Sequence, residues 1–525
     1  MLPIVVIGGG ISGVSCCQQL AESLPERTIV LVCPVDVIKV AHLVGRLGRT
    51  MDQLDVSQES VDYLTKQYPN VSFCRDQVIG LNAQRHELTL KKMTATAGKT
   101  LIYDKLCICL GAKPKMIDIR FNSSCSCDDD DDLQLINDHI VVIRDTQTVR
   151  EFTDKLKNAN RVVIVGNGGI ASELVHHIRH CQLIWCIKDQ HMSAPYLDPL
   201  ASEFFARQLN DITVSSSSSN NSNNNSGDDV TDSHEKLPQN MTAKQQQTDQ
   251  TLFGTGLGPD SWQQLSRLKG ADHRQRKSVR IETKCEVQSI ANTVDDRQKS
   301  RIVKIDDSDD TTAQEWPIYV ELTNGRIFGC NLVVSAIGVV PNTDAILLGN
   351  NFAIGAEGGL IVNNQMLTSE PDVYAAGDCC SVAWHPANDR WFQMRLWSQA
   401  RQMGCYSALC IAADIHSTSA EIYFNFELFS HLTYLFDRKV VLLGQYNWQN
   451  VCDHSQCKTL VKVTEDNKQL IKVVLNSDHR MIGAILVGDT ELEETFENLI
   501  LNQLDLSCFG DQLLDINVDI DDYFD

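Results

Sequence analysis

The 525-residue sequence predicts an α/β protein built from two similar strand–turn–helix units and a smaller C-terminal α+β domain. The first observation is a glycine-rich turn between an apolar run and a helical pattern, which occurs at residues 4–20 and again at residues 161–175. The second is the alternation of strand and helix patterns around both turns, which is typical of parallel sheets. Strands are expected at 4–7, 28–32, 162–165, 183–187 and 332–337.

The composition excludes several classes of protein. Apolar residues make up 43% of the chain and charged residues 22%, as in ordinary globular proteins. No stretch reaches the roughly 20 apolar residues of a membrane span, and a glycine-rich turn follows residues 3–7 where a signal peptide would have its cleavage site. We therefore expect a cytosolic or nuclear protein. The net charge of −22 disfavours direct binding of nucleic acid and leaves a basic protein partner open.

The 19 cysteines are expected to be reduced thiols. Their number is odd, and many lie within apolar runs, such as Cys107 and Cys109 in KLCICLG and Cys186 in LIWCIKD. A free cysteine in such a run behaves as a small buried hydrophobic residue.

The pattern divides the chain into four segments. Residues 1–115 form the first unit, residues 116–325 the second, and residues 326–415 return to the first. From about residue 420 the alternation suggests an antiparallel sheet, and ELEETFENLILNQL predicts an amphipathic helix, so residues 416–525 are expected to form the α+β domain with an acidic tail. Two polar insertions, 215–251 and 123–132, contain too few large apolar residues to fold.

The first turn contains Gly8, Gly10 and Gly13 in the pattern G-x-G-x-x-G directly after a strand. This spacing predicts a Rossmann-like site for a dinucleotide, because the glycines permit a tight turn, a close phosphate and close helix packing. The acid that usually contacts the ribose is absent, since the second strand ends at Cys33 and the nearest acid is Asp36. The expected cofactor contacts here are Gly8, Gly9, Gly10, Ile11, Ser12 and Gly13.

The second turn repeats the pattern with alanine as its last member. Its second strand ends in Lys188 and Asp189, and an acid there favours NAD whereas a base accommodates NADP, so the preference stays open. The alternative is a degenerate duplicate that binds nothing. The expected contacts are Gly166, Gly168, Gly169, Ala171 and Lys188.

Three further segments place glycines at the ends of strands. YDKLCICLGAKP reaches Gly111, TNGRIFGCNLVVSAIGVVPNT reaches Gly338, and TSEPDVYAAGDCC contains Gly377 and Asp378. With the two loops, these motifs in this order over residues 1–415 resemble the two-dinucleotide-binding-domain flavoproteins, also called the pyridine nucleotide–disulphide oxidoreductases.

The resemblance implies two cofactors. FAD would bind the first loop, within residues 1–115 and 326–415, and NADH or NADPH would bind the second, within residues 116–325. Hydride would pass from the nicotinamide to the flavin, with Asp378 beside the FAD. Gly111, Gly338 and Gly377 join the expected cofactor contacts, as does Val78.

The resemblance also implies candidates for catalysis. Lys39 falls where some members place a lysine against the flavin, the alternative being an ordinary surface lysine. Glu173 matches a glutamate near the nicotinamide, although an acid in the first turn of a helix is also favoured by the helix dipole. Cys379 and Cys380, next to Asp378, are candidate redox thiols, as is Cys33, and buried structural cysteines are the alternative.

The chain lacks the redox pair of the disulphide-reducing members. Residues 34–60 contain no cysteine, and no His-Pro…Glu arrangement occurs near the C-terminus. Cys452 and Cys457 have a suitable spacing in an unsuitable region, and Cys125 and Cys127 lie in an insertion, so we interpret none of them as a redox pair.

We therefore expect an FAD-dependent NAD(P)H oxidoreductase without a catalytic disulphide, which reduces oxygen, a quinone, or an external thiol or protein. The resemblance implies a role in oxidative-stress defence and association with the tRNA ligase complex. Two alternatives stay open: a non-catalytic flavin-containing redox sensor or scaffold, and a true disulphide reductase that uses Cys379 or Cys33.

Overall fold

The computed structural model describes residues 1–91, 99–118, 130–143, 146–214, 268–271, 278–304, 315–384, 390–422, 424–451, 453, 455 and 457–515. The low-complexity stretch 215–251, Cys125, Cys127 and Cys452 lie outside these residues. The insertion expected at 123–132 overlaps α3 (Asp130–Asp138), so its last three residues belong to a helix. The apolar residues that follow account for this, because Ile136 is buried on that helix. Among the described residues, every helix falls short of the length or apolarity that a membrane span requires.

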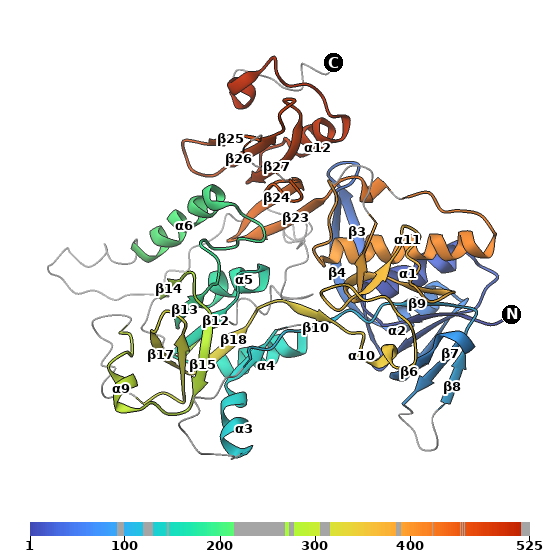
Figure 1. Cartoon of the computed structure of the whole chain (residues 1–525), viewed down its shortest axis with the longest axis horizontal. Coiled ribbons are helices and arrows are strands. Elements are labelled where there is room, and N and C mark those ends of the chain that lie inside the picture. Colours follow the sequence, from blue (N-terminus) through green and yellow to red (C-terminus); the bar gives the residue numbers. More distant parts are fainter. Residues whose placement is uncertain are drawn as a thin grey trace, which may run out of the picture.

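The first unit is an α/β layer built from both ends of residues 1–415 (Figure 1). Its parallel sheet has the order β21-β9-β1-β2-β5. These strands are β21 (Val373–Ala375), β9 (Lys105–Ile108), β1 (Ile4–Ile7), β2 (Ile29–Cys33) and β5 (Val71–Arg75). Helix α1 (Ile11–Ser23) packs against α11 (Trp397–Ile415), which brings the returning segment onto the first glycine loop.

Three smaller elements flank this sheet, two of them antiparallel and one parallel. One is the long hairpin of β3 (Val37–Arg46) and β4 (Asp52–Ser60), followed by α2 (Val61–Gln67). Another is the three-stranded sheet of β6 (Val78–Asn82), β7 (Glu87–Leu90) and β8 (Lys99–Ile102). A third, parallel pair joins β20 (Leu360–Val362) to β22 (Cys380–Val382).

The second unit repeats the first with a parallel sheet in the order β11-β18-β12-β13-β14. The strands are β11 (Ile140–Val142), β18 (Leu332–Ser335), β12 (Arg161–Val165), β13 (Gln182–Cys186) and β14 (Ser278–Glu282). The accompanying helices are α4 (Thr146–Leu156), α5 (Gly169–His177) and α6 (Pro199–Val214), and an antiparallel sheet comprises β15 (Val287–Ala291), β16 (Ile318–Leu322) and β17 (Ile327–Cys330).

The chain returns to the first unit later than residue 326, where the sequence placed the boundary. Strands β17 and β18 both belong to the second unit, because the apolar run at 332–335 pairs with β11 and β12. The crossing is made by β10 (Ala112–Pro114) and β19 (Val339–Pro341), which pair antiparallel between the two units.

The C-terminal domain is an antiparallel sheet in the order β23-β24-β27-β26-β25, covered by α12 (Glu493–Asn502). The strands are β23 (Ser430–Leu435), β24 (Arg438–Gly444), β25 (Lys458–Val463), β26 (Leu470–Leu475) and β27 (Met481–Val487). One face of the sheet shares an apolar core with the second unit, and the other packs under α12, as the alternation of apolar residues along each strand requires. Two Rossmann-like domains and a C-terminal α+β domain thus form the α/β fold.

Candidate functional site

In the first glycine loop, a side chain in place of either of two glycines would clash with the neighbouring backbone. Gly8 has φ +113°, and a Cβ there would lie 2.2 Å from the carbonyl oxygen of Cys109. A Cβ on Gly13 would lie 2.0 Å from the carbonyl oxygen of Gly8, whereas one on Gly10 would meet nothing within 4 Å. Gly10 is also the N-cap of α1. The turn therefore leaves open space in front of the helix N-terminus, whose N–H groups favour an anion.

The second loop has the same geometry. Gly166 has φ +129°, and a Cβ there would lie 2.1 Å from the carbonyl oxygen of Ala336. Gly168 is the N-cap of α5, and a Cβ on it would meet nothing within 4 Å. Ala171, the third member of the motif, is fully buried against the core. Both loops are therefore shaped to admit a diphosphate, which argues against the degenerate-duplicate interpretation of the second.

A cavity of about 1020 Å³ extends from the second loop to the first unit. On the side of the second unit it is lined by the loop itself, Glu173, Lys188 and Gly338. On the side of the first unit it is lined by Lys39 and Asp378, and β23 of the C-terminal domain forms a further wall. Candidate residues from segments far apart in the sequence thus meet in one space.

Lys39 and Glu173 both occupy positions suited to a role in this cavity. Lys39 is half-buried on β3, and its backbone N–H donates to the carbonyl of Gly9 over 2.9 Å. Glu173 is buried on α5. Burial and the nearby Glu173 carboxylate raise the pKa of Tyr196 to about 12, so the Tyr196 hydroxyl keeps its proton at neutral pH. The structure thus brings both predicted residues to the cavity, and their catalytic roles stay predictions.

Other predicted contacts lie around the first loop, outside the lining of the cavity. Gly377 has φ +79°, and a Cβ there would lie 2.8 Å from Cβ of Ser12, so the turn that carries Asp378 packs directly on the loop. Gly111 has φ +65° at the end of β9. Val78 opens β6 and is buried in the core of the first unit. No contact of Val78 or Gly111 with the cavity is seen among the described residues, and their assignment to FAD stays a prediction.

The candidate redox thiols are buried in apolar surroundings. Cys379 and Cys380 are both fully buried and lie outside the lining of the cavity. Burial raises the pKa of Cys379 to about 12, and its Sγ donates to the carbonyl of Ile108 over 3.2 Å. Burial likewise raises the pKa of Cys380 well above its ordinary value. Cys33 is buried with its Sγ against Gly9. These surroundings favour structural cysteines over reactive thiolates.

The cavity is also lined by Cys186, which its apolar run predicts to be a core residue, and by Cys285, which belongs to no motif. Cys186 ends β13, and its Sγ lies 3.7 Å from Sγ of Cys285. The hydrogen bond between them lowers the pKa of Cys285 and, together with burial, raises the pKa of Cys186. No sequence signal could join them, because they lie 99 positions apart.

Four further lining residues could not be found from the sequence. They are Asp52, Tyr196, Arg395 and His431. The ring of His431, on β23, lies 6.2 Å from the ring of Tyr196, and burial lowers the pKa of His431 to about 4, so its imidazole is neutral at pH 7. None of these four belongs to a motif named above, and only the folding of four separate segments brings them together.

The C-terminal domain fixes one wall of the cavity through a buried carboxylate. Glu497, on α12, is fully buried and accepts hydrogen bonds from the backbone N–H groups of Arg49 and Thr50, both over 2.6 Å. Ser430 donates to the carbonyl of Thr50 over 2.9 Å. Because Thr50 and the next residues line the cavity, α12 and β23 set the position of the loop between β3 and β4.

Just beyond the end of β13, the chain carries both a base, Lys188, which would accommodate NADPH, and an acid, Asp189, which would favour NADH. The side-chain amide of Asn167 donates to the Asp189 carboxylate over 2.8 Å and to the carbonyl of His191 over 2.9 Å. Lys188 is exposed and also lines the cavity. The carboxylate is thus held at the rim of the second loop with a lysine beside it, and the choice between NADH and NADPH stays open.

The residues present fit the two cofactors that the resemblance implies. The open space before Gly10 and before Gly168 would receive a diphosphate at each helix N-terminus. Asp378 and Lys39 would lie at the flavin, and Glu173 near the nicotinamide.

Comparisons with known proteins agree with this geometry. A family model described as pyridine nucleotide-disulphide oxidoreductase matches residues 2–292 and 273–404. The Pongo abelii protein named pyridine nucleotide-disulfide oxidoreductase domain-containing protein 1 is 41% identical over 526 residues, which cover 99% of this chain and 97% of that protein.

Two solved structures share the fold. The water-forming NADH oxidase from Lactobacillus brevis, bound to NADH, has a TM-score of 0.62 at 16% identity and covers 99% of this chain and 95% of its own. The covalent putidaredoxin reductase–putidaredoxin complex has a TM-score of 0.61 at 16% identity, covering 96% of this chain and 94% of that chain.

Proposed function

Since this chain belongs to the pyridine nucleotide-disulphide oxidoreductase family, we propose that it is an FAD-dependent NAD(P)H oxidoreductase that works without a redox-active cysteine pair. One observation carries the proposal: a single cavity connects the second glycine loop to Lys39 and Asp378. When bound there, the two cofactors would supply the redox chemistry, a hydride transfer between the nicotinamide and the flavin.

The protein's own part is to bind, orient and enclose. The helix N-termini after Gly10 and Gly168 hold diphosphates, and the half-buried Lys39 places a positive charge beside the flavin site. Tyr196 and His431 present a protonated hydroxyl and a neutral imidazole to the cavity, so neither carries a charge at neutral pH.

The proposed electron acceptor is oxygen, a quinone, or an external thiol or protein. An internal thiol relay through Cys379 or Cys380 is disfavoured because their thiols are buried and keep their protons. We extend the proposal to a role in oxidative-stress defence in the cytoplasm and nucleus, with the tRNA ligase complex as partner. This extension rests on the resemblance of the sequence alone.

The test is spectroscopic. We expect the purified protein to be yellow with bound FAD, and its flavin absorbance to bleach when NADH or NADPH is added without oxygen. Readmission of oxygen, or addition of a quinone or a disulphide, then identifies the acceptor by the return of colour. Failure to bleach with either nucleotide would remove the oxidoreductase assignment.

The burial of the thiols also favours a second candidate, a flavin-containing redox sensor or scaffold. Such a protein would undergo one stoichiometric reduction and persist in that state, since the thiols of Cys33, Cys379 and Cys380 near the first loop are buried. Oxygen consumption separates the two candidates. Many turnovers per flavin indicate an enzyme, and a single reduction without turnover indicates a sensor.

A further inference from the structure

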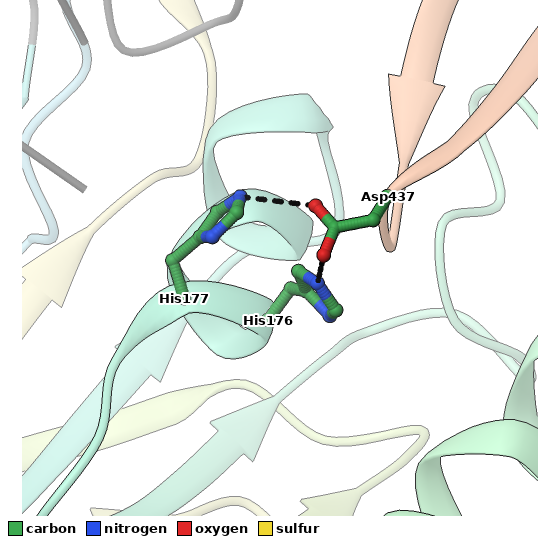
Figure 2. A group of neighbouring side chains, drawn as sticks. All are labelled: His176, His177 and Asp437. Carbon is green, nitrogen blue, oxygen red and sulfur yellow. Dashed lines mark hydrogen bonds and ion pairs between the residues drawn. The ribbon is translucent and has the colours of Figure 1, made fainter. Parts of the chain in front are cut away.

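A cluster of two imidazoles and one carboxylate lies at the opposite end of α5 from the second glycine loop. His176 and His177 are the last two residues of α5, and Asp437 lies in the turn between β23 and β24. Figure 2 shows the two oxygens of the Asp437 carboxylate directed at the two imidazoles, one at each. None of the three residues lines the cavity described above.

The distances are close to those of a metal site. Nε2 of His176 lies 2.7 Å from Oδ2 of Asp437, and Nε2 of His177 lies 3.9 Å from Oδ1. One ligand atom from each residue can be chosen so that all three lie within 4.8 Å of one another. Zinc bonds of about 2.0–2.2 Å place tetrahedral ligands roughly 3.4 Å apart. Small side-chain rotations of His177 and Asp437 would therefore bring the three atoms around one ion.

The surroundings of the cluster favour a cation electrostatically and leave the cluster accessible to ions from solvent. The C-terminal end of a helix carries the negative end of its dipole, which favours a cation. The His176 side chain is 8% exposed and that of Asp437 59%, so one side of the cluster faces solvent. That side leaves room for a water molecule to complete the coordination.

The ligand types indicate which ion the cluster selects. Two of the three candidate ligands are imidazoles, which favour zinc and its neighbours over calcium or magnesium. The Asp437 carboxylate adds one oxygen ligand, and the guanidinium of Arg179 lies close enough to interact with it.

We propose that His176, His177 and Asp437 bind one divalent transition-metal ion of the zinc class, with water as the remaining ligand. The ion takes the place of the proton that His176 and Asp437 share, and that proton passes to solvent or to the other ring nitrogen. It joins the helix of the second glycine loop to the C-terminal sheet. Because α5 has nine residues, the ion lies about 12 Å along the helix from the loop.

The experiment uses the full chain in its apo form, with Co²⁺ as a coloured substitute for Zn²⁺. We expect one Co²⁺ per chain with the visible spectrum of nitrogen and oxygen ligands, displaced by one equivalent of Zn²⁺. Asp437→Asn and His177→Ala should each weaken binding by more than about tenfold. Asn tolerates the backbone of Asp437, which has φ +60°, so the turn survives the first substitution.

Two controls keep the result interpretable. His416→Ala removes an exposed histidine outside the cluster and should leave Co²⁺ binding unchanged. The thermal midpoint of each variant without metal shows that it folds. Absence of stoichiometric binding would overturn the proposal. So would a thiolate charge-transfer band that persists in Asp437→Asn, because it would assign the metal to cysteines. Neither result bears on flavin reduction, so the proposal stands or falls independently of the proposed function.

Discussion

The two glycine loops share one backbone geometry and differ in what surrounds them. In each, the first glycine has φ above +110° and the second faces open space. The first loop, however, is covered by the returning segment: a Cβ on Gly404 of α11 would lie 2.2 Å from the carbonyl of Ser12, and Gly377 is packed on the same residue. The second loop lines the 1020 Å³ cavity through all of residues 166–170.

This difference matches the different tasks of two cofactors. We infer that a cofactor at the first loop lies against chain from both ends of residues 1–415, because α11 and the Gly377 turn both pack on Ser12 of that loop. A nucleotide at the second loop sits in a cavity and exchanges without rearranging the core. We infer that the first site retains its cofactor through many reactions and the second exchanges its own at each one.

The largest effect is expected from Gly10→Ala. A methyl group there meets no protein atom within 4 Å, so the fold should form normally, but it occupies the space in front of α1. We expect FAD affinity to fall by roughly tenfold or more, equivalent to about 1.4 kcal/mol. The measurement is the flavin-to-protein absorbance ratio after gel filtration, together with the thermal midpoint of the apo protein.

Gly8→Ala provides the matched comparison. Its Cβ would lie 2.2 Å from the carbonyl of Cys109 at a φ of +113°, so the apo fold itself should lose on the order of 1–3 kcal/mol. If Gly10→Ala keeps its full complement of FAD, the open space in front of α1 is not the phosphate site.

Gly168→Ala should separate the two sites. The substitution changes the second loop as Gly10→Ala changes the first, so the protein should stay yellow and stable. The NADH or NADPH concentration that half-bleaches the flavin should rise about tenfold, measured by anaerobic titration. Loss of FAD in this variant would contradict the assignment of separate cofactors to the two loops.

The local parts of this arrangement could be predicted from the sequence, because they depend on residues close together in the chain. The spacing of Gly8, Gly10 and Gly13 dictates a strand, a turn and a helix. The apolar run Leu332–Ser335 likewise predicts a buried strand, whichever sheet it joins. The domain boundary near that strand was wrong because a buried apolar run does not disclose which sheet it joins. The strand β18 pairs with the second unit, and the chain crosses only at β19.

The walls of the cavity could not be predicted, since they arise from long-range packing. Glu497 lies 447 positions from Thr50, so no local pattern connects the two residues. In addition, an acidic residue in an amphipathic helix is normally expected on the solvent-exposed face. Tyr196 and His431 meet across the boundary between the second unit and the C-terminal sheet. The sequence likewise singled out Cys379 and Cys380, beside Asp378, as candidate redox thiols, with buried structural cysteines as the alternative. Among the described residues, the cysteines that line the cavity are instead Cys186 and Cys285.

Cysteine labelling should reproduce the contrast between the loops. Around the first loop, burial raises the pKa of Cys379 to about 12, so alkylation at pH 8 should be undetectable. Beside the second loop, the pKa of Cys285 is lowered by its hydrogen bond with Cys186, and the thiol lines the cavity. Cys285 is itself only 2% exposed, so reagent must reach it through the cavity. We expect iodoacetamide to modify Cys285 more slowly than the exposed Cys508 but faster than Cys379, and NADH to slow the reaction of Cys285 further, as measured by peptide mass spectrometry.

The exposed Cys508 is the internal control for this experiment, because its labelling rate should be the same with and without the nucleotide. The pH dependence supplies a second check. A thiol whose pKa is raised by folding stabilises the native state below its ordinary value of 9.0, and that stability is lost as pH rises toward 12. Labelling of Cys379 should therefore begin above about pH 9, together with unfolding, and labelling at pH 7 in the folded protein would contradict its burial.

The smallest effect is expected where the two motifs differ in sequence. Ala171 stands where the first loop has Gly13, and it is fully buried near the start of α5. Ala171→Gly removes a helix-favouring residue and one buried methyl group, so the free energy of unfolding should fall by about 1 kcal/mol with nucleotide affinity unchanged. The reverse change, Gly13→Ala, should cost more, because its Cβ would lie 2.0 Å from the carbonyl of Gly8. Urea unfolding of both variants measures the asymmetry. Equal losses would mean that the helices of the two loops approach their strands equally closely. The difference between Gly13 and Ala171 would then have no structural consequence.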